Sequence, residues 1–323
     1  MELICPAGTA SAFKDAVEAG ADAVYCGFRD ETNARNFPGL NLTRDELAAC
    51  IGFARKRDVK TFVAINTFMH AGNEKLWTDA VDDAAALDAD AVILADLGLL
   101  AYTAERHPQL RRHLSVQAGA ANVDHLNFLV AAFGIRRAVL PRVLTVAEIA
   151  ALTAQVACET EVFVFGGLCV MEEGRCSLSS YATGKSPNMH GVCSPASHVR
   201  YRRDGGEMVS ELGEFTINRF PEAEAAGYPT LCKGRFEAGG VTGYLFEDPV
   251  SLDVLSEARQ LERAGVKALK IEGRQRGRAY VRQVVTAIRE ALSRDDPAGA
   301  SAALRQLSEG QRTTTGSYEK RWR

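Results

Sequence analysis

Four cysteines are concentrated in one polar, glycine-rich part of the chain. Cys169, Cys176 and Cys193 lie within GLCVMEEGRCSLSSYATGKSPNMHGVCSP, and Cys232 follows in YPTLCKGRF. These surroundings differ from those of cysteines that pack as small apolar residues in a core. Clustered cysteines in a reducing compartment usually bind metal or take part in redox chemistry. The sequence therefore predicts that Cys169, Cys176, Cys193 and Cys232 are ligands of one metal centre.

The spacing of these cysteines, C-x6-C-x16-C-x38-C, bears on the kind of centre they hold. Zinc and iron–sulfur clusters both use four thiolates, but structural zinc sites usually include one tight C-x2-4-C turn, which this spacing lacks. The iron corners of a cubane cluster are held from separate backbone segments, so wide spacing suits it better. The sequence favours a 4Fe-4S cluster and leaves zinc open. Glycines would let the backbone approach such a cluster: Gly166, Gly167, Gly174 and Gly191.

Polar residues that follow apolar runs are candidates for contacts with a substrate. Arg35 stands in the loop DETNARNFPGLN, and Glu272 and Arg274 stand in KIEGR. We predict catalytic roles for these three residues, because charged groups at strand ends can bind and polarise a substrate. The alternative is structural: Arg35 would only solvate a loop, and Glu272 would pair with Arg274 to close a barrel. Weaker candidates of the same kind are Asn33, Asn36, Asn66, Asp96, Gln117 and Arg142.

The elements that must position these residues alternate regularly along the chain. Eight short apolar runs end in turn-forming or polar residues: ELICPAG, ADAVYCG, KTFVAIN, ADAVILAD, HLSVQAG, RRAVLPR, EVFVFGG and VKALKIEG. Amphipathic, Ala- and Leu-rich helical patterns with Ser, Thr or Asp caps separate most of them. No Gly-x-Gly-x-x-Gly fingerprint follows the first run, so the pattern indicates an α/β fold of the TIM (β/α)8 type rather than a doubly wound sheet. Active sites of that fold lie at the carboxyl ends of the strands, where the four cysteines fall.

The barrel pattern is interrupted once, after the seventh strand. We expect residues 1–293 to form the barrel, interrupted by a cysteine-bearing insertion at 168–250 with two hairpins that turn on Asp-Gly-Gly and Gly-Gly. A helix at about 251–264 then leads into the eighth strand. Periodicity is lost in 294–323, which we expect to be a tail that wraps around the barrel or hangs from it.

Composition limits the classes of partner. A formal net charge of −3 provides no global positive field, so we do not expect nucleic acid as a partner despite basic runs at 200–203 and 320–323. The start MELICPAGTA has no basic region and no apolar stretch typical of a signal peptide, and no later segment is long and apolar enough to span a membrane. We therefore expect a cytoplasmic protein.

Several strings of the sequence resemble one known family. CVMEEGRCSLSSYATGKSPN, GYPTLCKGR, ELICPAG with ADAVYCG, and KIEGRQR are similar to segments of the collagenase-like peptidase family, and most closely to its UbiU subfamily. The resemblance runs from the first residue to the terminal TTTGSYEKRW. Its most specific part is the cysteine stretch, since ELICPAG and KIEGR are shared across the wider family.

The resemblance implies a cofactor, a partner and a reaction. UbiU-like proteins bind one 4Fe-4S cluster through four cysteines, which fall here on Cys169, Cys176, Cys193 and Cys232. They form a heterodimer with a UbiV-like iron–sulfur protein, and the pair hydroxylates the aromatic ring of polyprenyl-phenol precursors of ubiquinone without dioxygen. Peptidase activity has no support in the residues, because the sequence contains no His-Glu-x-x-His motif and no cysteine flanked by a His and an acid.

Two other functions stay open at the level of sequence. Relatives in the wider family hydroxylate a uridine in transfer RNA, and the basic runs would then contact phosphates. Alternatively, the chain is a non-catalytic scaffold that carries a cluster for its partner, since electron-transfer and catalytic clusters use the same ligands.

Overall fold

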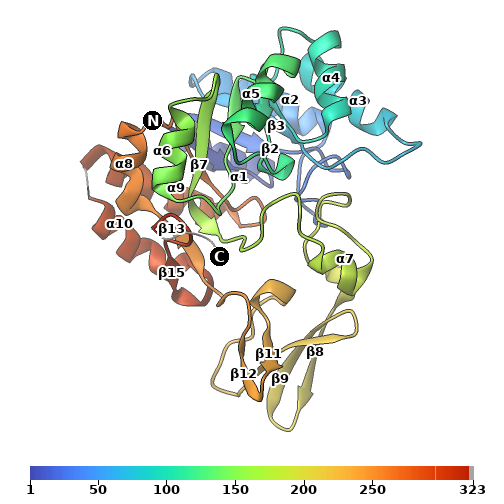
Figure 1. The fold of residues 1–323 in the computed structure, drawn as a ribbon, viewed down its shortest axis with the longest axis vertical. Coiled ribbons are helices and arrows are strands. Elements are labelled where there is room, and N and C mark those ends of the chain that lie inside the picture. Colours follow the sequence, from blue (N-terminus) through green and yellow to red (C-terminus); the bar gives the residue numbers. More distant parts are fainter. Residues whose placement is uncertain (295, 320–323) are drawn as a thin grey trace.

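The computed structural model describes residues 1–294 and 296–319 and contains a closed barrel of eight parallel strands (Figure 1). Strand β14 pairs in parallel with both β1 and β7, which closes the sheet. The predicted TIM-type barrel is confirmed, and each of the eight apolar runs supplies one strand. The barrel strands are β1 (Glu2–Pro6), β2 (Ala23–Cys26), β3 (Lys60–Ile65), β4 (Ala91–Leu94), β5 (Arg112–Leu114), β6 (Arg137–Val139), β7 (Glu159–Gly167) and β14 (Ala268–Ile271).

Helices surround the barrel and begin where the sequence offers caps. Thr43 and Thr145 each accept a backbone hydrogen bond from the glutamate three residues later, which returns the bond in a capping box. No helix among the described residues is both long and apolar enough to cross a membrane. The helices are α1 (Ala10–Glu18), α2 (Arg44–Arg55), α3 (Lys75–Ala86), α4 (Leu97–Arg106), α5 (Val123–Phe133), α6 (Val146–Thr153), α8 (Ala258–Arg263) and α9 (Arg278–Arg294).

The segment after β7 leaves the barrel and projects as a small β-rich lobe (Figure 1). Strands β8, β9 and β10 form one antiparallel sheet, and β11 pairs with β12 in a second. Strand β10 has no clear sequence signal, because an irregular register near Thr216 and Asn218 interrupts its alternation. The elements are α7 (Leu178–Thr183), β8 (Val199–Asp204), β9 (Glu207–Leu212), β10 (Phe215–Phe220), β11 (Arg235–Ala238) and β12 (Val241–Tyr244).

One prediction about the last part of the chain was wrong in detail. The expected helix at about 251–264 begins as a strand, β13 (Ser251–Asp253), because the carboxyl end of the long β7 extends beyond the barrel and offers an antiparallel partner. The described tail is more regular than its loss of periodicity suggested. It contains α10 (Pro297–Leu304) and β15 (Thr313–Thr314), which pairs in parallel with β13. The 3-10 helices are η1 (Val116–Ala118), η2 (Ala196–His198), η3 (Leu231–Lys233), η4 (Leu255–Glu257), η5 (Arg305–Leu307) and η6 (Glu309–Gln311).

The apolar core has two parts, one on each side of the sheet. The larger part packs the outer face of the strands against the helices. The smaller part fills the inside of the barrel, where alanines leave room for a few large side chains: Ile4, Ala23, Tyr25, Phe62, Ala64, Ala91, Ile93 and Ala268. Charged groups lie at both ends of this inner core, so the barrel has two chemically distinct openings.

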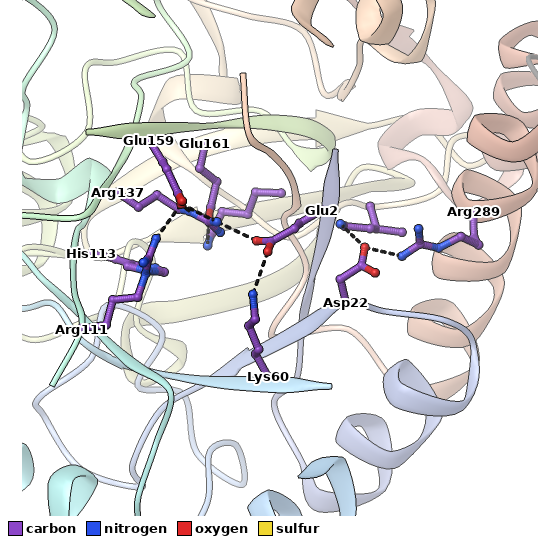
Figure 2. A network of polar contacts seen from close by, with 11 residues as sticks. Glu2, Asp22, Lys60, Arg111, His113, Arg137, Glu159, Glu161 and Arg289 are labelled. Carbon is purple, nitrogen blue, oxygen red and sulfur yellow. Dashed lines mark hydrogen bonds and ion pairs between the residues drawn. The ribbon is translucent and has the colours of Figure 1, made fainter. Parts of the chain in front are cut away.

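A network of ion pairs closes the amino end of the barrel (Figure 2). The guanidinium of Arg137 donates to Glu2 at 2.6 Å and to Glu159 at 2.8 Å. It also contacts Glu161 at 3.3 Å. The second oxygen of Glu2 accepts from Lys60 at 2.8 Å. The buried Arg137 is thus surrounded by carboxylates, which offset the cost of removing its charge from water.

Candidate functional site

A polar cavity occupies the carboxyl end of the barrel, which we call the mouth cavity. Its volume is about 50 Å³, and it opens to solvent. Polar and charged residues from several strand ends and loops line it: Arg35, Asn66, Ser115, Gln117, Arg142, Lys270, Glu272 and Arg274. Its apolar wall is formed by Tyr25, Ala34, Ala64, Ile93, Val116, Val139 and Phe163. The cavity therefore combines a cationic lining with an apolar, partly aromatic wall.

Arg35 and Glu272 form an ion pair across the cavity mouth. The Arg35 Nε lies 3.3 Å from Glu272 Oε1, and the backbone N–H of Gly167 donates to Glu272 Oε2 at 3.1 Å. Burial pushes the pKa of Glu272 upward, but Arg35 and Arg142 outweigh it and hold the pKa below its usual value. The carboxylate is therefore ionised and its orientation is set by three separate segments of the chain.

The structural alternative for Glu272 predicted the wrong ion pair. Glu272 pairs with Arg35 rather than with Arg274. Gly273 between them has a φ of 152°, a conformation that disfavours side chains, and the chain turns there. Arg274 instead donates to Asn33 Oδ1 at 3.2 Å. The three predicted site residues thus share one cavity but have different partners.

A second buried ion pair joins the barrel to the cysteine loop, the segment 167–195. Arg142 Nε donates to Glu173 Oε1 at 2.6 Å, and both side chains are 3% exposed. Arg142 also donates to the carbonyl of Gly167, and its guanidinium lies 4.2 Å from the centroid of the Phe163 ring. Despite burial, the Glu173 carboxylate raises the pKa of Arg142. This pair fixes the start of the cysteine loop against the barrel.

The floor of the mouth cavity is a buried lysine. Lys270 Nζ donates to Glu161 Oε1 at 2.6 Å and lies 3.9 Å from the centroid of the Tyr25 ring. Burial lowers the pKa of Lys270, although Glu161 opposes this effect. Because Glu161 also contacts Arg137, this contact connects the cavity to the ion-pair network at the other end of the barrel.

The four predicted ligand cysteines lie at the same end of the barrel as the mouth cavity. Cys169 follows β7, Cys176 and Cys193 lie on either side of α7, and Cys232 lies in η3. Burial raises the pKa of the Cys169 and Cys193 thiols to about 12, with a further contribution from Cys232. Cys176 in turn raises the pKa of Cys193 and that of Cys232. Such mutual electrostatic effects indicate that the four thiols lie in the same region of the structure.

The sulfur atoms of these four cysteines could bind a positively charged metal centre in place of their protons. Cys193 is exposed as a residue although its thiol group is shielded from solvent, and the other three cysteines are partly buried. Buried thiols become thiolates only when a positive charge compensates them, and a metal supplies such a charge. Within the described parts of the chain, no group of three or more His, Cys, Asp and Glu side chains is arranged to hold a single metal ion.

Glycines of the cysteine loop have a more specific role than the sequence suggested. A side chain on Gly174 would meet the carbonyl oxygen of Gln117, and one on Gly191 would meet that of Asn33. Both glycines also have positive φ, of 83° and 76°. They allow the cysteine loop to pack directly on two loops of the barrel mouth, which places the thiols beside the cavity.

The weaker sequence candidates divide into cavity residues and structural residues. Gln117 lines the cavity, as does Asn66, whose side chain bonds Ala34 and Ser115. Asp96 only caps helix α4, and the backbone N–H of Asn36 binds Gly191. Arg142 and Asn33 position neighbouring groups through the contacts described above.

Sequence reasoning missed Glu173 and Lys270. Nothing local distinguishes Glu173 from a solvated loop acid, because its partner Arg142 is 31 residues away. Lys270 did have a signal: it stands two positions before Glu272 on a strand, so both side chains point to the same face.

Comparisons with known proteins agree on one family. The profile described as Peptidase family U32 matches residues 8–318. The tRNA hydroxylation protein P of Escherichia coli strain K12 is 31% identical over 320 residues, which cover 92% of this chain and 68% of that protein. The 23S rRNA 5-hydroxycytidine C2501 synthase of the same strain is 28% identical over 297 residues, 90% of this chain and 39% of the synthase.

A solved structure supports the same assignment at the level of fold. A U32 peptidase is similar with a TM-score of 0.50 at 13% identity, covering 84% of this chain and 93% of the peptidase chain. The profile match spans nearly the whole chain and includes the mouth cavity, the cysteine loop and every barrel strand except β1. The chain therefore belongs to peptidase family U32.

Proposed function

We propose that this chain is the iron–sulfur subunit of an oxygen-independent hydroxylase in ubiquinone biosynthesis. It acts as a heterodimer with a UbiV-like iron–sulfur protein and hydroxylates the aromatic ring of a polyprenyl-phenol precursor. The observation that carries the proposal is that four neighbouring thiols lie beside a charged cavity with an apolar wall. The named relatives support the reaction class, because one is a tRNA hydroxylation protein and the other a 5-hydroxycytidine synthase of 23S rRNA.

Four cysteines would hold a 4Fe-4S cluster in this proposal: Cys169, Cys176, Cys193 and Cys232. Their wide spacing in the sequence, without a tight C-x2-4-C turn, suits the separated corners of a cluster better than a structural zinc site. When bound, the cluster supplies the route for electrons that ring hydroxylation without dioxygen requires.

Two arginines connect the thiols to the mouth cavity. Cys193 raises the pKa of Arg35, and Cys169 raises the pKa of Arg142. Each guanidinium therefore lies near a thiol, and each also lines the cavity. Their partners Glu272 and Glu173 hold them in place. In the proposed enzyme, Arg35 and Glu272 orient the substrate ring at the opening, and Arg142 positions the cysteine loop.

The ion pairs of the lobe favour a quinone precursor over transfer RNA. The basic run in β8 is largely neutralised: Arg202 contacts Glu211 at 2.9 Å and Asp204 at 3.0 Å, and Arg200 lies 3.6 Å from Glu211. The neighbouring carboxylates reduce the net positive charge that this strand offers to phosphates. The resemblance of the cysteine stretch to UbiU points to the same substrate class.

A metal analysis tests the cofactor. The chain purified without air should contain about four irons and four sulfides, and serine substitution of any one of the four cysteines should lower both. Cys158→Ser is a matched control, because Cys158 is partly buried and lies at the amino end of the barrel, directly before β7. Stoichiometric zinc in a colourless protein would contradict the cluster.

A deletion strain grown without oxygen tests the substrate. Loss of ubiquinone with unchanged hydroxyuridine in transfer RNA is the expected result, and the reverse pattern would establish the RNA function instead. Complementation with Cys176→Ala distinguishes an enzyme from a scaffold. Full recovery of ubiquinone with this variant would show that the cluster of this subunit is dispensable.

A further inference from the structure

Arg274 is a buried cation without a carboxylate partner. Its side chain is 4% exposed, and its hydrogen bond to Asn33 Oδ1 at 3.2 Å engages only one of five N–H donors. The ring of Tyr25, 5.7 Å away, gives some further stabilisation. Among the described residues, no Asp or Glu oxygen lies within ion-pair distance of this guanidinium. A buried charge of this kind is costly unless another group compensates it.

The other cations of the mouth cavity are all compensated. Arg35 pairs with Glu272, Arg142 with Glu173 and Lys270 with Glu161. Since each of these pairs is neutral overall, the cavity carries one positive charge in excess, and that charge is on Arg274. The excess matches a ligand with one negative charge.

Arg274 is also held in a fixed position. Gly27 has no side chain, and a Cβ there would lie 2.9 Å from Arg274 Nη1 and 2.7 Å from Asn33 Cγ. A Cβ on Gly8 would meet the Arg274 carbonyl oxygen. Gly27 therefore leaves room for the guanidinium and Gly8 for the backbone of Arg274. The fork geometry of a guanidinium suits two parallel hydrogen bonds to a carboxylate.

Other groups in the cavity define the remainder of the ligand. Gln117 lines the cavity, and its side-chain oxygen is buried without a hydrogen-bond partner. A buried acceptor of this kind requires a donor, such as a hydroxyl. Tyr25, Ile93 and Phe163 provide an apolar wall for a ring or a short hydrocarbon body.

We propose that the mouth cavity binds a small organic monocarboxylate that has an apolar body and a hydroxyl group, with Arg274 as the anchor of the carboxylate. The inference deepens the proposed function, on which it rests for the role of the cavity as the reaction site. The carboxylate compensates Arg274, the hydroxyl donates to Gln117, and the body packs on the aromatic wall. Phosphate and sulfate fit less well, because they carry close to two charges and no apolar body.

Calorimetric titration of the full chain, purified without air, tests the inference with 4-hydroxybenzoate as the probe. Wild-type protein should bind it, and Arg274→Gln should weaken the binding by about tenfold to hundredfold. Arg276→Gln is the control, because Arg276 is exposed and follows two residues later. The neutral analogue 4-hydroxybenzamide should bind wild-type protein at least tenfold more weakly. That comparison still decides the matter if Arg274→Gln does not fold.

Three results would overturn the inference: no binding of 4-hydroxybenzoate at millimolar concentration, equal binding by Arg274→Gln, or equally tight binding of sulfate. The titration needs neither the partner nor hydroxylation, so it fails independently of the proposed function. Carboxylate binding in a protein that does not support ubiquinone synthesis would remove the proposed function alone. Ubiquinone synthesis by a protein that binds no carboxylate would remove this inference alone.

Discussion

The two ends of the barrel use buried charge in opposite ways. At the amino end, Arg137 is surrounded by three carboxylates, and the network ends in groups that reach solvent, such as Lys60 (Figure 2). At the carboxyl end, three ion pairs are complete, but Arg274 has no carboxylate partner among the residues that the structure describes. A network in which every charge has a partner closes and stabilises a barrel. A buried charge without a partner destabilises the free protein, and a ligand of opposite charge can remove this cost when it binds. The difference supports the proposal that the mouth is the functional end, by an argument that does not use the cysteines.

The largest effect is expected at Glu161, which connects the two ends. Glu161→Gln leaves Lys270 and Arg137 with less negative charge around them in a buried site. We expect it to lower the free energy of unfolding by about 3–5 kcal/mol. Urea denaturation of the full chain measures this loss, and Asp79→Asn in the exposed pair with Lys75 is the matched control. A loss no larger than that of the control would mean that the network does not stabilise the barrel.

A smaller effect is expected at Glu272 in the cavity. Glu272→Gln keeps an acceptor for the Gly167 N–H but removes the charge that pairs with Arg35, so we expect a loss of about 1–3 kcal/mol. The sign of the pH dependence follows from the lowered pKa of Glu272. Its contribution is present above the pKa of the unfolded chain and is lost as the pH falls through the folded pKa.

Denaturation at a series of pH values from neutral to acidic tests this linkage. Wild-type stability should decrease on acidification by more than that of Glu272→Gln, and the two curves should converge at low pH. Parallel curves over the whole range would contradict ionised Glu272 as a stabilising group.

The smallest change in stability is expected at Arg274, although it is as buried as the residues of the other network. Arg274→Gln removes a charge that no carboxylate compensates, so the free energy of unfolding should stay within about 1 kcal/mol of wild type or increase. Thermal denaturation of both proteins without added ligand measures it. A loss as large as that of Glu161→Gln would show that Arg274 has a structural role, and the contrast between the two ends would disappear.

The sequence could predict much of the fold because its signals are local. Each barrel strand is a short apolar run, and capping residues such as Thr43 and Thr145 mark helix starts within a few positions. The prediction was less accurate where a distant partner decides the structure. Ser251–Asp253 is a strand only because β7 extends far enough to pair with it, and the same partnership places β15 beside β13.

The candidate site shows the same division. Arg35, Glu272 and Arg274 could be predicted from their places after strands, and all three line the mouth cavity. Their partners could not be predicted, because Asn33 and Arg274 are 241 residues apart and meet only when β14 closes the barrel against β1.

What the sequence by itself determined is the chemical inventory: eight strands in order, and four thiols in a glycine-rich, polar segment whose composition does not suit a core. These features depend on residue type and short-range spacing, which the chain carries in any conformation. Only the tertiary structure decided which charges are compensated. Barrel closure brings together side chains from opposite ends of the chain, and it gives Arg137 three carboxylates while it leaves Arg274 with an amide oxygen.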